Sequence, residues 1–312
     1  MDDIWDCIVI GGGAAGLSAA LVLGRARKRT LLVDAGAPSN LPAHGIGGLL
    51  GHDDRPPAEL YADGRRELAA YPAVSVRDGR VVAATVDDTG VTATLADGTV
   101  ERARRVILAT GMDYRLPDVP GLAERWGRSV FHCPFCHGWE VRDRPLGVLD
   151  GDPATGVHRA LLLRGWSDDV TLLTNGPAAL AADDRRALED AGVEVDERPV
   201  IGVDGPGDEL ATISFADGTS RACGGLLVAV VLHQRSALAA QLGLPLAPPT
   251  PIAADAVVGG PTGETAVARV LVAGDAAVGM PSVANAIAAG SNAAAAVVRQ
   301  LLTEDRSFAM HT

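Results

Sequence analysis

The chain contains 312 residues, and we expect two domains because a single hydrophobic core rarely grows past about 250 to 300 residues. Hydrophobic residues make up 47% and aromatic residues only 4%, so the core must consist of Ala, Val, Leu and Ile, which favours an α/β fold over an aromatic-rich all-β fold. The formal net charge of −12 argues against nucleic acid as a partner, because the phosphate backbone would be repelled.

The first predicted elements form a strand–helix–strand unit. Residues 5–10 (WDCIVI) are typical of a buried strand, and GGGAAG leads from them into an Ala- and Leu-rich helix that extends to about Leu23. A second strand, TLLVD, covers residues 30–34. We expect no membrane-spanning segment, since no stretch is apolar and long enough to cross a bilayer without interruption.

The glycines between the first strand and the helix indicate a dinucleotide site. Gly11, Gly13 and Gly16 fit the pattern G-x-G-x-x-G, in which the glycines allow a tight turn, the approach of a pyrophosphate and close helix–strand packing. Asp34, at the end of the next strand, can accept hydrogen bonds from ribose hydroxyls, which suits an adenosine ribose without a 2′-phosphate. The glycine pattern alone would also fit a tight turn that binds nothing.

The middle of the first region reads as a loop, a helix and a small sheet. Residues 37–57 are rich in Gly, Pro, Asn and His and predict an ordered loop, whereas residues 57–70 predict a helix. The segment 74–111 alternates as a small antiparallel sheet, with turns at DDTG and ADG. Residues 113–121 (DYRLPDVPG) look like a linker.

The rest of the chain repeats the first theme and then returns to it. Residues 145–232 contain the strands LGVLD, DVTLLT and GLLVAVVL, two helices, and a hairpin around FADGTS. After two prolines, VARVLVAGDAAVG predicts a strand and a turn, and PSVANAIAAGSNAAAAVVRQLL predicts a long helix of small residues. We therefore predict two Rossmann-like α/β domains with small antiparallel sheets, one discontinuous domain formed by residues 1–115 and 245–312 and one inserted domain formed by residues 116–244.

Two further strand ends suit a flavin dinucleotide. Residues 109–111 (ATG) close one predicted strand, and Gly274 and Asp275 close another, which places a carboxylate where it could bind ribityl hydroxyls. A helix that begins near Ser282 or Val283 would direct its positive end at the negative charge of a reduced flavin. An ordinary strand–turn–helix is the alternative for each piece alone, but together they indicate FAD.

The segment VFHCPFCHGWE places Cys133 and Cys136 three residues apart, between His132 and His137. Such a pair can be a metal site, a structural disulfide or a redox centre. A zinc site would need further ligands, and Cys7 and Cys223 lie in other predicted elements, where both suit small core residues, so we expect no metal. Four cysteines are too few for a secreted disulfide scaffold, and we expect a cytoplasmic protein with a redox-active pair.

In this order and spacing, GGGAAG, ATG, C-x-x-C and the late GD pair resemble the low-molecular-weight thioredoxin reductases over nearly the whole chain. The resemblance implies an FAD domain built from both ends of the chain, an inserted pyridine-nucleotide domain that carries the cysteines, and a homodimer. It also implies a set of FAD-binding positions. These are Gly11, Gly13, Ala14, Ala15, Gly16, Asp34, Ala35, Gly36, Ser39, Asn40, Val82, Ala109, Thr110, Gly111, Gly274, Asp275, Val283 and Ala284.

The second nucleotide site departs from that family. Where the family has roughly V-G-G-G-D-x-A, this chain has Val-Leu-Asp-Gly-Asp-Pro-Ala at 148–154, so Leu149 fills the tight turn and Asp150 places a negative charge at the pyrophosphate position. The arginine clamp for the 2′-phosphate of NADPH falls on residues 174–180 (TNGPAAL), which contain no arginine. Arg185 and Arg186 are poor substitutes because they lie farther along the chain, so we expect a domain that has kept its fold and lost its cofactor.

The redox motif also differs from that family. His137 stands where the family has the acid that shuttles a proton at the disulfide, and a histidine near its ordinary pKa of about 6.5 can take a proton from a thiol at neutral pH. His132 is a second candidate base, and either histidine could instead have no proton role. We assign Cys133, Cys136, His137 and His132 to the catalytic site.

A reductase-like frame with CPFCHGWE and without an NADPH clamp resembles the FAD-dependent dithiol oxidases that form the disulfides of gliotoxin, holomycin and romidepsin. That resemblance implies oxidation of a small-molecule dithiol, held near Trp139 or between subunits, with O2 as the electron acceptor and H2O2 as a product, in antibiotic biosynthesis or self-resistance. The alternatives are a thioredoxin reductase-like enzyme with a protein dithiol partner or a donor other than NADPH, and a flavoprotein that sequesters a reactive dithiol without turnover.

Overall fold

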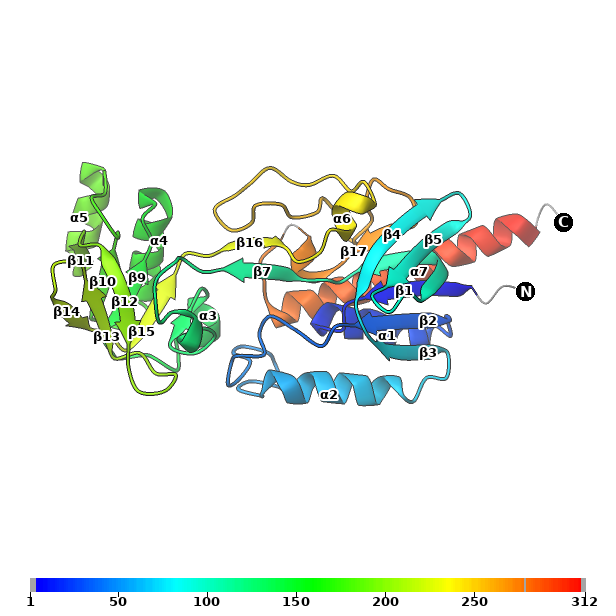
Figure 1. The fold of residues 1–312 in the computed structure, drawn as a ribbon, viewed down its shortest axis with the longest axis horizontal. Helices are drawn as coiled ribbons and strands as arrows, with labels where there is room; N and C mark the ends of the chain where they lie inside the picture. The colour runs from blue at the N-terminus through cyan, green and yellow to red at the C-terminus, as the bar shows by residue number, and fades with distance from the viewer. Residues whose placement is uncertain (1–3, 278, 310–312) are drawn as a thin grey trace. The chain divides into compact units, whose positions relative to one another are not determined.

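The structure is a computed structural model that describes residues 4–277 and 279–309. The chain divides into two compact units (Figure 1). The first unit comprises Met1–Ser39, Pro57–Asp113 and Leu232–Thr312, and the second comprises Asn40–Pro56 and Tyr114–Val231. In the described part of the chain, no helix is both long enough and apolar enough to cross a membrane.

A mainly parallel sheet forms the centre of the first unit. Its parallel strands lie in the order β3-β2-β1-β6, with β17 beside β6. They are Trp5–Ile10 (β1), Thr30–Asp34 (β2), Val74–Asp78 (β3), Val100–Leu108 (β6) and Val270–Val272 (β17). The strands β1, β2 and β17 are almost entirely buried apolar runs because side chains cover both faces of the sheet. The predicted strands at 5–10 and 30–34 are confirmed.

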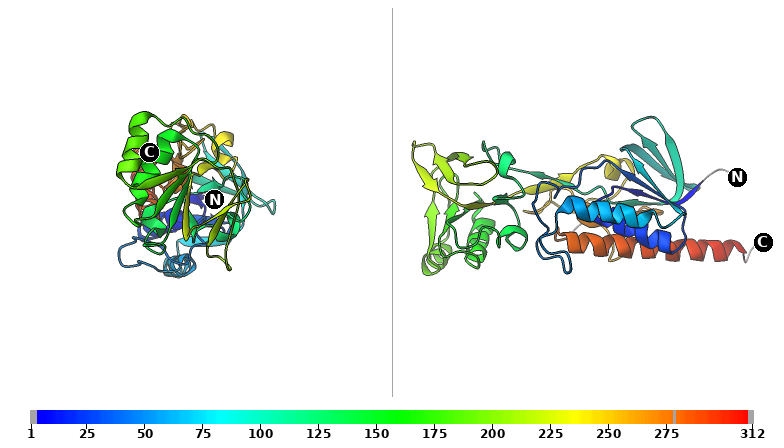
Figure 2. Two further views of the ribbon diagram at one scale, coloured as in Figure 1. Left: turned by 90° about the vertical axis from the view of Figure 1, so that its left-hand side faces the viewer. Right: turned by 90° about the horizontal axis from the view of Figure 1, so that it is seen from below.

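Helices of small residues cover one face of this sheet. The helices α1 (Ala14–Arg25) and α7 (Val283–Ala309) lie side by side, with α2 (Pro57–Leu68) packed against α1 (Figure 2). Gly290 of α7 approaches the carbonyl of Ala15 so closely that a β-carbon there would overlap it. The Ala- and Gly-rich sequence of α7 therefore lets two helices meet almost backbone to backbone. The predicted long C-terminal helix is confirmed.

One part of the predicted antiparallel sheet is wrong. The strands β4 (Val81–Asp87) and β5 (Gly90–Leu95) do form an antiparallel meander with the start of β6. However, β3 pairs in parallel with β2. Because α2 carries the chain back to the start of the sheet before β3, a right-handed crossover makes β3 parallel and β2 its natural neighbour.

The second unit is a smaller α/β layer structure. Its five-stranded parallel sheet has the order β11-β10-β9-β15-β8. These strands are Val130–Phe131 (β8), Leu146–Leu149 (β9), Val170–Leu173 (β10), Val193–Asp196 (β11) and Gly225–Val228 (β15). The helices are α3 (Pro134–His137), α4 (Pro153–Leu163), α5 (Ala182–Asp190) and a 3-10 turn, Ala123–Arg125. A small antiparallel sheet of β12 (Val200–Asp204), β13 (Thr212–Phe215) and β14 (Ser220–Ala222) contains the predicted hairpin.

The second boundary between the units differs from the prediction. The segment GLLVAVVL is not one strand, because it divides at Ala229 and Val230 into β15 and β16 (Val231–Gln234). The strand β16 pairs with β7 (Met112–Arg115), which begins before the predicted linker. The chain therefore enters the first unit at 231/232 and not at 244/245, because α6 (Leu238–Gln241) and the residues after it pack into that unit's core.

The predicted loop at 37–57 is likewise divided between the units. Residues 40–56 belong to the second unit, where Arg128 donates a hydrogen bond from Nε to the Pro42 carbonyl at 3.0 Å. The same arginine forms an ion pair with Asp208, which in turn contacts Nε2 of His44 at 3.1 Å. This polar cluster holds the loop to the unit that carries the cysteine pair.

Candidate functional site

The first unit contains a cradle at the end of β1. The chain turns so sharply there that β-carbons at Gly11 and Gly16 would overlap the carbonyl oxygens of Ala109 and Gly11. Gly13 begins α1 without a side-chain cap, and the space where its β-carbon would stand is open. The amide groups of the first helical turn therefore face an open position, which is the arrangement that binds a diphosphate.

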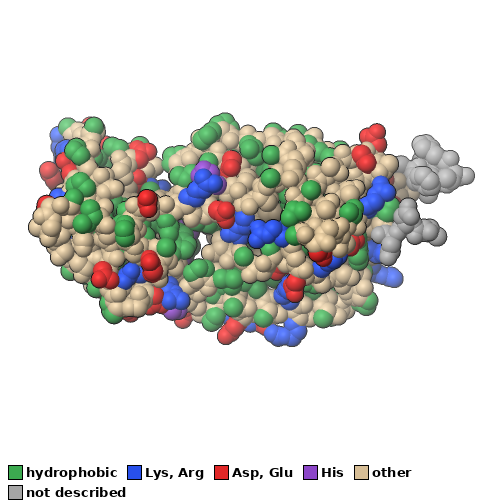
Figure 3. Space-filling model, in the orientation of Figure 1, with side chains coloured by type: hydrophobic (Ala, Val, Ile, Leu, Met, Phe, Trp, Pro, Cys, Tyr) green, Lys and Arg blue, Asp and Glu red, His purple; other side chains and the backbone are tan. Residues whose placement is uncertain are grey.

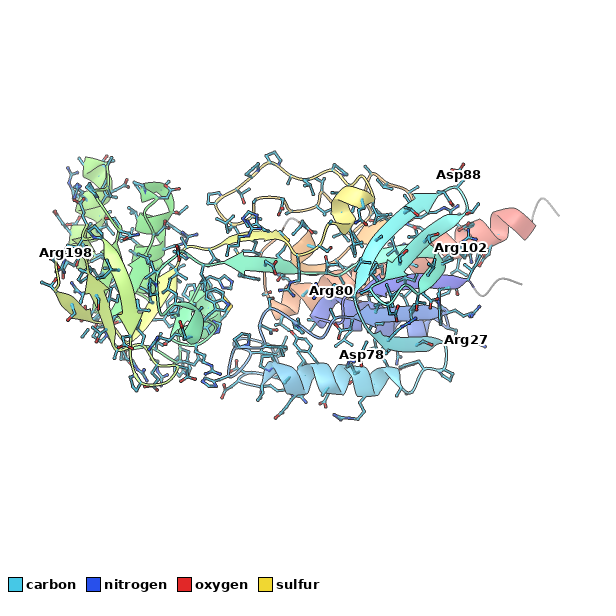
Figure 4. All side chains as sticks on the ribbon, viewed as in Figure 1. Arg27, Asp78, Arg80, Asp88, Arg102 and Arg198 are labelled. Atoms are coloured by element: carbon cyan, nitrogen blue, oxygen red, sulfur yellow. A yellow bond between two sulfur atoms is a disulfide. The ribbon has the colours of Figure 1, made fainter. Side chains whose placement is uncertain are left out.

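Asp34 lies at the end of β2 as predicted, buried to 8% exposure. One oxygen of its carboxylate, Oδ1, accepts hydrogen bonds from the amides of Gly12 at 3.1 Å and Gly36 at 3.0 Å. The other oxygen, Oδ2, lies 3.4 Å from Nη2 of Arg65, which also pairs with Asp78. Asp78 is labelled at the end of β3 in Figure 4. Asp34 therefore organises the turn with one oxygen and presents the other beside Arg65, a neighbour that no sequence motif marks.

A cavity of about 470 Å³ lies beside the predicted Gly274–Asp275 pair. Its walls are the end of β17, the glycine-rich segment 259–263, residues 279–281 and the start of α7. The helix α7 begins at Val283, where Ser282 caps it by accepting a hydrogen bond from the amide of Asn285 at 3.1 Å. The pair and the helix start thus adjoin a space that is large enough for an aromatic ring system.

Most predicted cofactor positions follow the carboxyl ends of parallel strands in the first unit. Ala14 and Ala15 open α1; Ala35, Gly36 and Ser39 follow β2; Ala109, Thr110 and Gly111 follow β6; Gly274 and Asp275 follow β17; and Val283 and Ala284 open α7. Two positions are placed otherwise, because Asn40 belongs to the second unit and Val82 lies in β4, 46% exposed. The carboxyl edge of a parallel sheet is where α/β folds bind nucleotides, so the cradle, the two carboxylates and the cavity fit FAD.

The second unit contains the cysteine pair as a disulfide. Cys133 and Cys136 are bonded, with their Cα atoms 5.3 Å apart. Cys133 precedes the single turn of α3, whose first residue is Pro134, and its carbonyl accepts hydrogen bonds at 3.2 Å from the amides of Cys136 and His137. The proline fixes the start of this turn, with Cys133 just before it and Cys136 within it, and so keeps the two cysteines close enough for their sulfur atoms to bond.

His137 is mostly buried beside the disulfide, and burial lowers its pKa below the ordinary value. The carbonyls of Gly127 and Cys133 oppose this shift, but neither ring nitrogen has a hydrogen-bond partner of good geometry in the described residues. The ring stacks on Phe131, with 5.9 Å between centroids. The expectation of an ordinary pKa is therefore wrong, and at neutral pH the ring is an uncharged imidazole with free acceptor capacity.

His132 has a still lower pKa, about 4, because of burial and then of the charges of His137 and Arg159. Its ring lies 4.9 Å from Tyr114 and 5.6 Å from Trp126, measured between centroids. A base of this strength holds few protons at neutral pH and accepts them weakly. Of the two predicted bases, His137 is therefore the better proton acceptor at neutral pH.

Aromatic side chains gather around the motif. The chain has eleven aromatic residues, and six of them lie in or next to this region of the second unit, namely Tyr114, Trp126, Phe131, Phe135, Trp139 and Trp166. Phe135 and Trp139 flank Cys136 in the chain and are exposed to 70% and 66%. Arg142 covers the Trp139 ring at 3.8 Å from its centroid. Exposed aromatic rings beside a disulfide suit the binding of an apolar thiol compound.

The loop 40–56 reaches the disulfide through Gly47. A β-carbon at Gly47 would come within 2.5 Å of the carbonyl oxygen of Cys136, so only a glycine lets the two backbones meet this closely. His44 contributes to the loop's anchor, whereas His52 is exposed and contacts Arg55 at 3.2 Å.

Side chains of the protein itself fill the position of the second nucleotide site considered in the sequence. Asp150 follows β9 and is buried to 5% exposure, and its carboxylate accepts hydrogen bonds from the amide of Asp152 at 3.0 Å and from Oγ1 of Thr155 at 2.7 Å. Arg159, one turn further into α4, forms an ion pair with the same carboxylate. An internal anion therefore occupies the start of α4, where a nucleotide diphosphate would need the same amides and positive charge.

The positions of the family's arginine clamp are also engaged in local contacts. Thr174 donates to the carbonyl of Gly176 at 2.6 Å, and Asn175 accepts from the amide of Val200 at 2.7 Å. Leu180 is buried. Arg185, one of the two possible substitutes, pairs with Glu197 at 3.4 Å.

The remaining cysteines lie within the two cores. Burial raises the pKa of the Cys7 thiol in β1, and it raises the pKa of Cys223 to about 11. Both thiols are therefore protonated and unreactive at neutral pH.

Among residues 4–277 and 279–309, no three His, Cys, Asp or Glu side chains are grouped as metal ligands. Acidic and basic side chains are interspersed on the face drawn in Figure 3.

The comparison with known proteins agrees with this geometry. Residues 5–290 match the family model of the pyridine nucleotide-disulphide oxidoreductases, a family of flavoproteins. A protein named thioredoxin reductase aclD, from Aspergillus oryzae, is 31% identical over 97% of this chain and 98% of its own length. Another, thioredoxin reductase tcpT from Claviceps purpurea, is 33% identical over 88% of this chain and 87% of its own.

Solved structures show the same fold. The crystal structure of HlmI has a TM-score of 0.91 and 38% identity, over 100% of this chain and 96% of that one. An oxidoreductase from Agrobacterium tumefaciens has a TM-score of 0.90 and 37% identity, over 96% and 99% of the two chains. The predicted resemblance is confirmed, and the chain is an oxidoreductase that belongs to the pyridine nucleotide-disulphide oxidoreductase family, with the fold of the thioredoxin reductases.

Proposed function

We propose that this protein is an FAD-dependent dithiol oxidase that forms an intramolecular disulfide in a small-molecule dithiol. The observation that carries the proposal is the carboxylate of Asp150 at the start of α4, held there by Arg159. A nicotinamide dinucleotide would have to displace a buried, fully engaged anion in order to bind, while the Cys133–Cys136 disulfide is intact. An enzyme that combines these two features can oxidise thiols through its disulfide but offers NADPH no open site at the start of α4.

The first step of the reaction is a thiol–disulfide exchange. His137, uncharged at neutral pH, takes the proton from one substrate thiol, and the resulting thiolate attacks the Cys133–Cys136 disulfide to give a mixed disulfide and one cysteine thiolate. The second substrate thiol then gives its proton to the free cysteine thiolate and displaces the other enzyme sulfur, which takes the proton held by His137. The substrate leaves as a cyclic disulfide, two electrons poorer, and the cysteines remain as a dithiol.

The cysteine dithiol must then be reoxidised. When bound, FAD would accept two electrons from this dithiol and reduce O2 to H2O2. Gly11, Gly13 and Gly16 would bind its diphosphate, Asp34 its adenosine ribose and Asp275 its ribityl hydroxyls. The exposed rings of Phe135 and Trp139 would bind the apolar body of the substrate.

The setting of the reaction follows from the same family resemblance. We propose a cytoplasmic homodimer that acts in the biosynthesis of a disulfide-bearing antibiotic or in resistance to it. The similarity to the solved structure of HlmI, which is 38% identical to this chain, supports this proposal.

A second candidate function is disulfide reduction with a protein dithiol partner and a donor other than NADPH. It is favoured by the names of the relatives aclD and tcpT, both thioredoxin reductases. It differs from the first in the direction of electron flow and in the partner of the cysteine pair.

The test is oxygen consumption by the purified, FAD-loaded protein with dithiothreitol as the probe and no pyridine nucleotide. The oxidase consumes one O2 and forms one H2O2 for each dithiol oxidised. A protein that takes no oxygen with any small dithiol, but reduces thioredoxin with a reduced ferredoxin as donor, is the reductase instead. Binding of a dithiol without peroxide would indicate sequestration.

A further inference from the structure

Two adjacent residues in the first unit contact three of the four segments that follow the strand ends of the predicted cofactor site. Gln234 is the last residue of β16, and Arg235 follows it, just after the chain has entered the first unit. We call them the Gln234–Arg235 pair. Neither residue belongs to a motif identified in the sequence, and neither was a predicted site residue.

The Arg235 side chain bonds to two of these segments. Its Nη1 donates to the carbonyl of Ala37 at 2.5 Å, and its Nη2 donates to the carbonyl of Met112 at 3.1 Å. Ala37 comes directly after Asp34–Gly36, and Met112 comes directly after Ala109–Gly111. The guanidinium completes its contacts with the carboxylate of Asp113 at 2.9 Å.

The Gln234 side chain bonds to the third segment. Its Nε2 donates to the carbonyl of Ala276 at 2.9 Å and to the carbonyl of Asp255 at 3.1 Å. Ala276 comes directly after Gly274 and Asp275. The backbone of Gln234 is itself fixed, because its amide donates to the carboxylate of Asp255 at 2.8 Å.

These contacts add side-chain hydrogen bonds to turns that lie beyond the main sheet. The ladders of β2, β6 and β17 end before Ala37, Met112 and Ala276. Met112 begins β7, which pairs with β16, and the Ala276 carbonyl also accepts a hydrogen bond from the amide of Val257 at 2.9 Å, so the pair reinforces these backbone contacts. A planar guanidinium with several donors can bind separate carbonyls at fixed angles, which a single hydrogen-bond donor cannot do. The pair therefore sets the relative positions of three turns that come from distant parts of the chain.

We propose that Gln234 and Arg235 are positioning residues, which hold these three turns in the geometry that binds FAD. The inference rests on the proposed function in taking FAD as the cofactor. Loss of either side chain loosens one or two turns, and FAD must then order them on binding, which weakens its affinity. The hydrogen bonds of the two side chains go to no residue of β1, β2, β6 or β17, so the fold of the apoprotein should remain.

The experiment compares Gln234→Ala, Arg235→Ala and Arg235→Lys with two matched controls. Gln300→Ala removes a side-chain amide that accepts from Arg105, and Arg77→Ala removes an arginine with three side-chain partners. Neither control contacts a predicted cofactor segment. For each apoprotein, FAD affinity is measured by quenching of flavin fluorescence, the bound flavin by its visible absorption and circular dichroism, and the fold by thermal unfolding without FAD.

We expect the Kd for FAD to rise about 10-fold in Gln234→Ala and in Arg235→Ala, with a changed flavin dichroism. Arg235→Lys should recover part of the affinity, because an ammonium can still reach one carbonyl. The controls should stay within about twofold of the wild-type Kd.

The proposal is overturned if Gln234→Ala and Arg235→Ala bind FAD as tightly as the wild type does. It is overturned as well if the two control variants weaken FAD binding as much as Gln234→Ala and Arg235→Ala do. It is also overturned if the loss of affinity only parallels a lower melting temperature of the apoprotein. Should the wild type itself not bind FAD, both this inference and the proposed function are wrong. Should it bind FAD and oxidise dithiols while the variants bind equally well, only this inference is wrong.

Discussion

The carboxylate of Asp150, which follows β9, and the guanidinium of Arg159 in α4 form an ion pair at the position where the family resemblance places a nucleotide diphosphate. The exposed fraction of the Asp150 side chain is 3% and that of Arg159 is 18%. The pair replaces an external anion with an internal one. It also lies near enough to the redox site for the charge of Arg159 to help lower the pKa of His132.

Removing one partner of this pair should destabilise the second unit. Asp150→Asn keeps the shape of the side chain but leaves Arg159 without its counter-charge, and we expect the free energy of unfolding to fall by about 3 kcal/mol. The measurement is urea denaturation of Asp150→Asn, Arg159→Gln and the double variant. The double variant should lose less than the sum of the two single losses, and simple additivity would mean that the pair is not coupled.

Replacing Cys136 should stop the reaction while leaving the flavin in place. Cys136→Ser removes the disulfide but none of the first unit's contacts, so we expect normal FAD content and no reduction of the flavin by dithiothreitol under nitrogen. The control is Cys223→Ala, which truncates a buried thiol in the same unit and should retain turnover. Turnover by Cys136→Ser at the wild-type rate would remove the disulfide from the mechanism.

The role of His137 predicts a particular pH dependence. A substrate thiol with a pKa of about 8.5 is roughly 3% ionised at pH 7, so a neighbouring base can accelerate its attack by at most about 30-fold. His137→Ala should therefore slow flavin reduction by up to about 30-fold at pH 7, and the two rates should converge above about pH 8.5. Because the pKa of His137 is lowered, the wild-type rate should decline only below about pH 6.5.

Stopped-flow absorbance of the flavin measures these rates, and His158→Ala, which alters an exposed histidine of α4, serves as the control. If the rates of His137→Ala and the wild type agree at every pH, the proton passes to His132 or to solvent.

The buried His132 predicts that the protein loses stability in mild acid. Its pKa is about 4 in the folded protein and about 6.5 when unfolded, so the unfolded chain binds more protons between these values. The stabilising effect is complete above pH 6.5 and is lost as the pH falls towards 4, to an extent on the order of 3 kcal/mol. His132→Phe, which keeps a ring between Tyr114 and Trp126, should flatten this part of the pH profile of unfolding. Identical pH profiles for the variant and the wild type would contradict this.

Much of the fold could be predicted because its signals are local. The buried strands at 5–10 and 30–34, the glycine turn between them and the strand before Gly274 each carry their pattern within a few residues. By contrast, the placement of β3 depends on the crossover through α2, and the division of GLLVAVVL depends on which sheet each half joins. Such choices are made by contacts between segments that are far apart in the sequence.

The candidate site was predictable to the same extent. The cysteine pair, His137 and Asp34 could be proposed because each belongs to a short motif. The partners that modify them were not, since Arg65, Arg159 and the aromatic rings around His132 come from other elements. The lowered pKa of His137 could not be predicted either, because burial is a property of the folded environment and not of the motif.

The most direct test of the account is the reduction of the bound flavin under nitrogen, followed by its absorbance, with NADPH in one sample and dithiothreitol in the other. The account predicts that the flavin stays oxidised with NADPH at concentrations far above those that saturate a reductase, and that it bleaches with the dithiol and recovers when air is admitted. Rapid bleaching by micromolar NADPH would contradict it, because a nucleotide would then bind despite the carboxylate of Asp150.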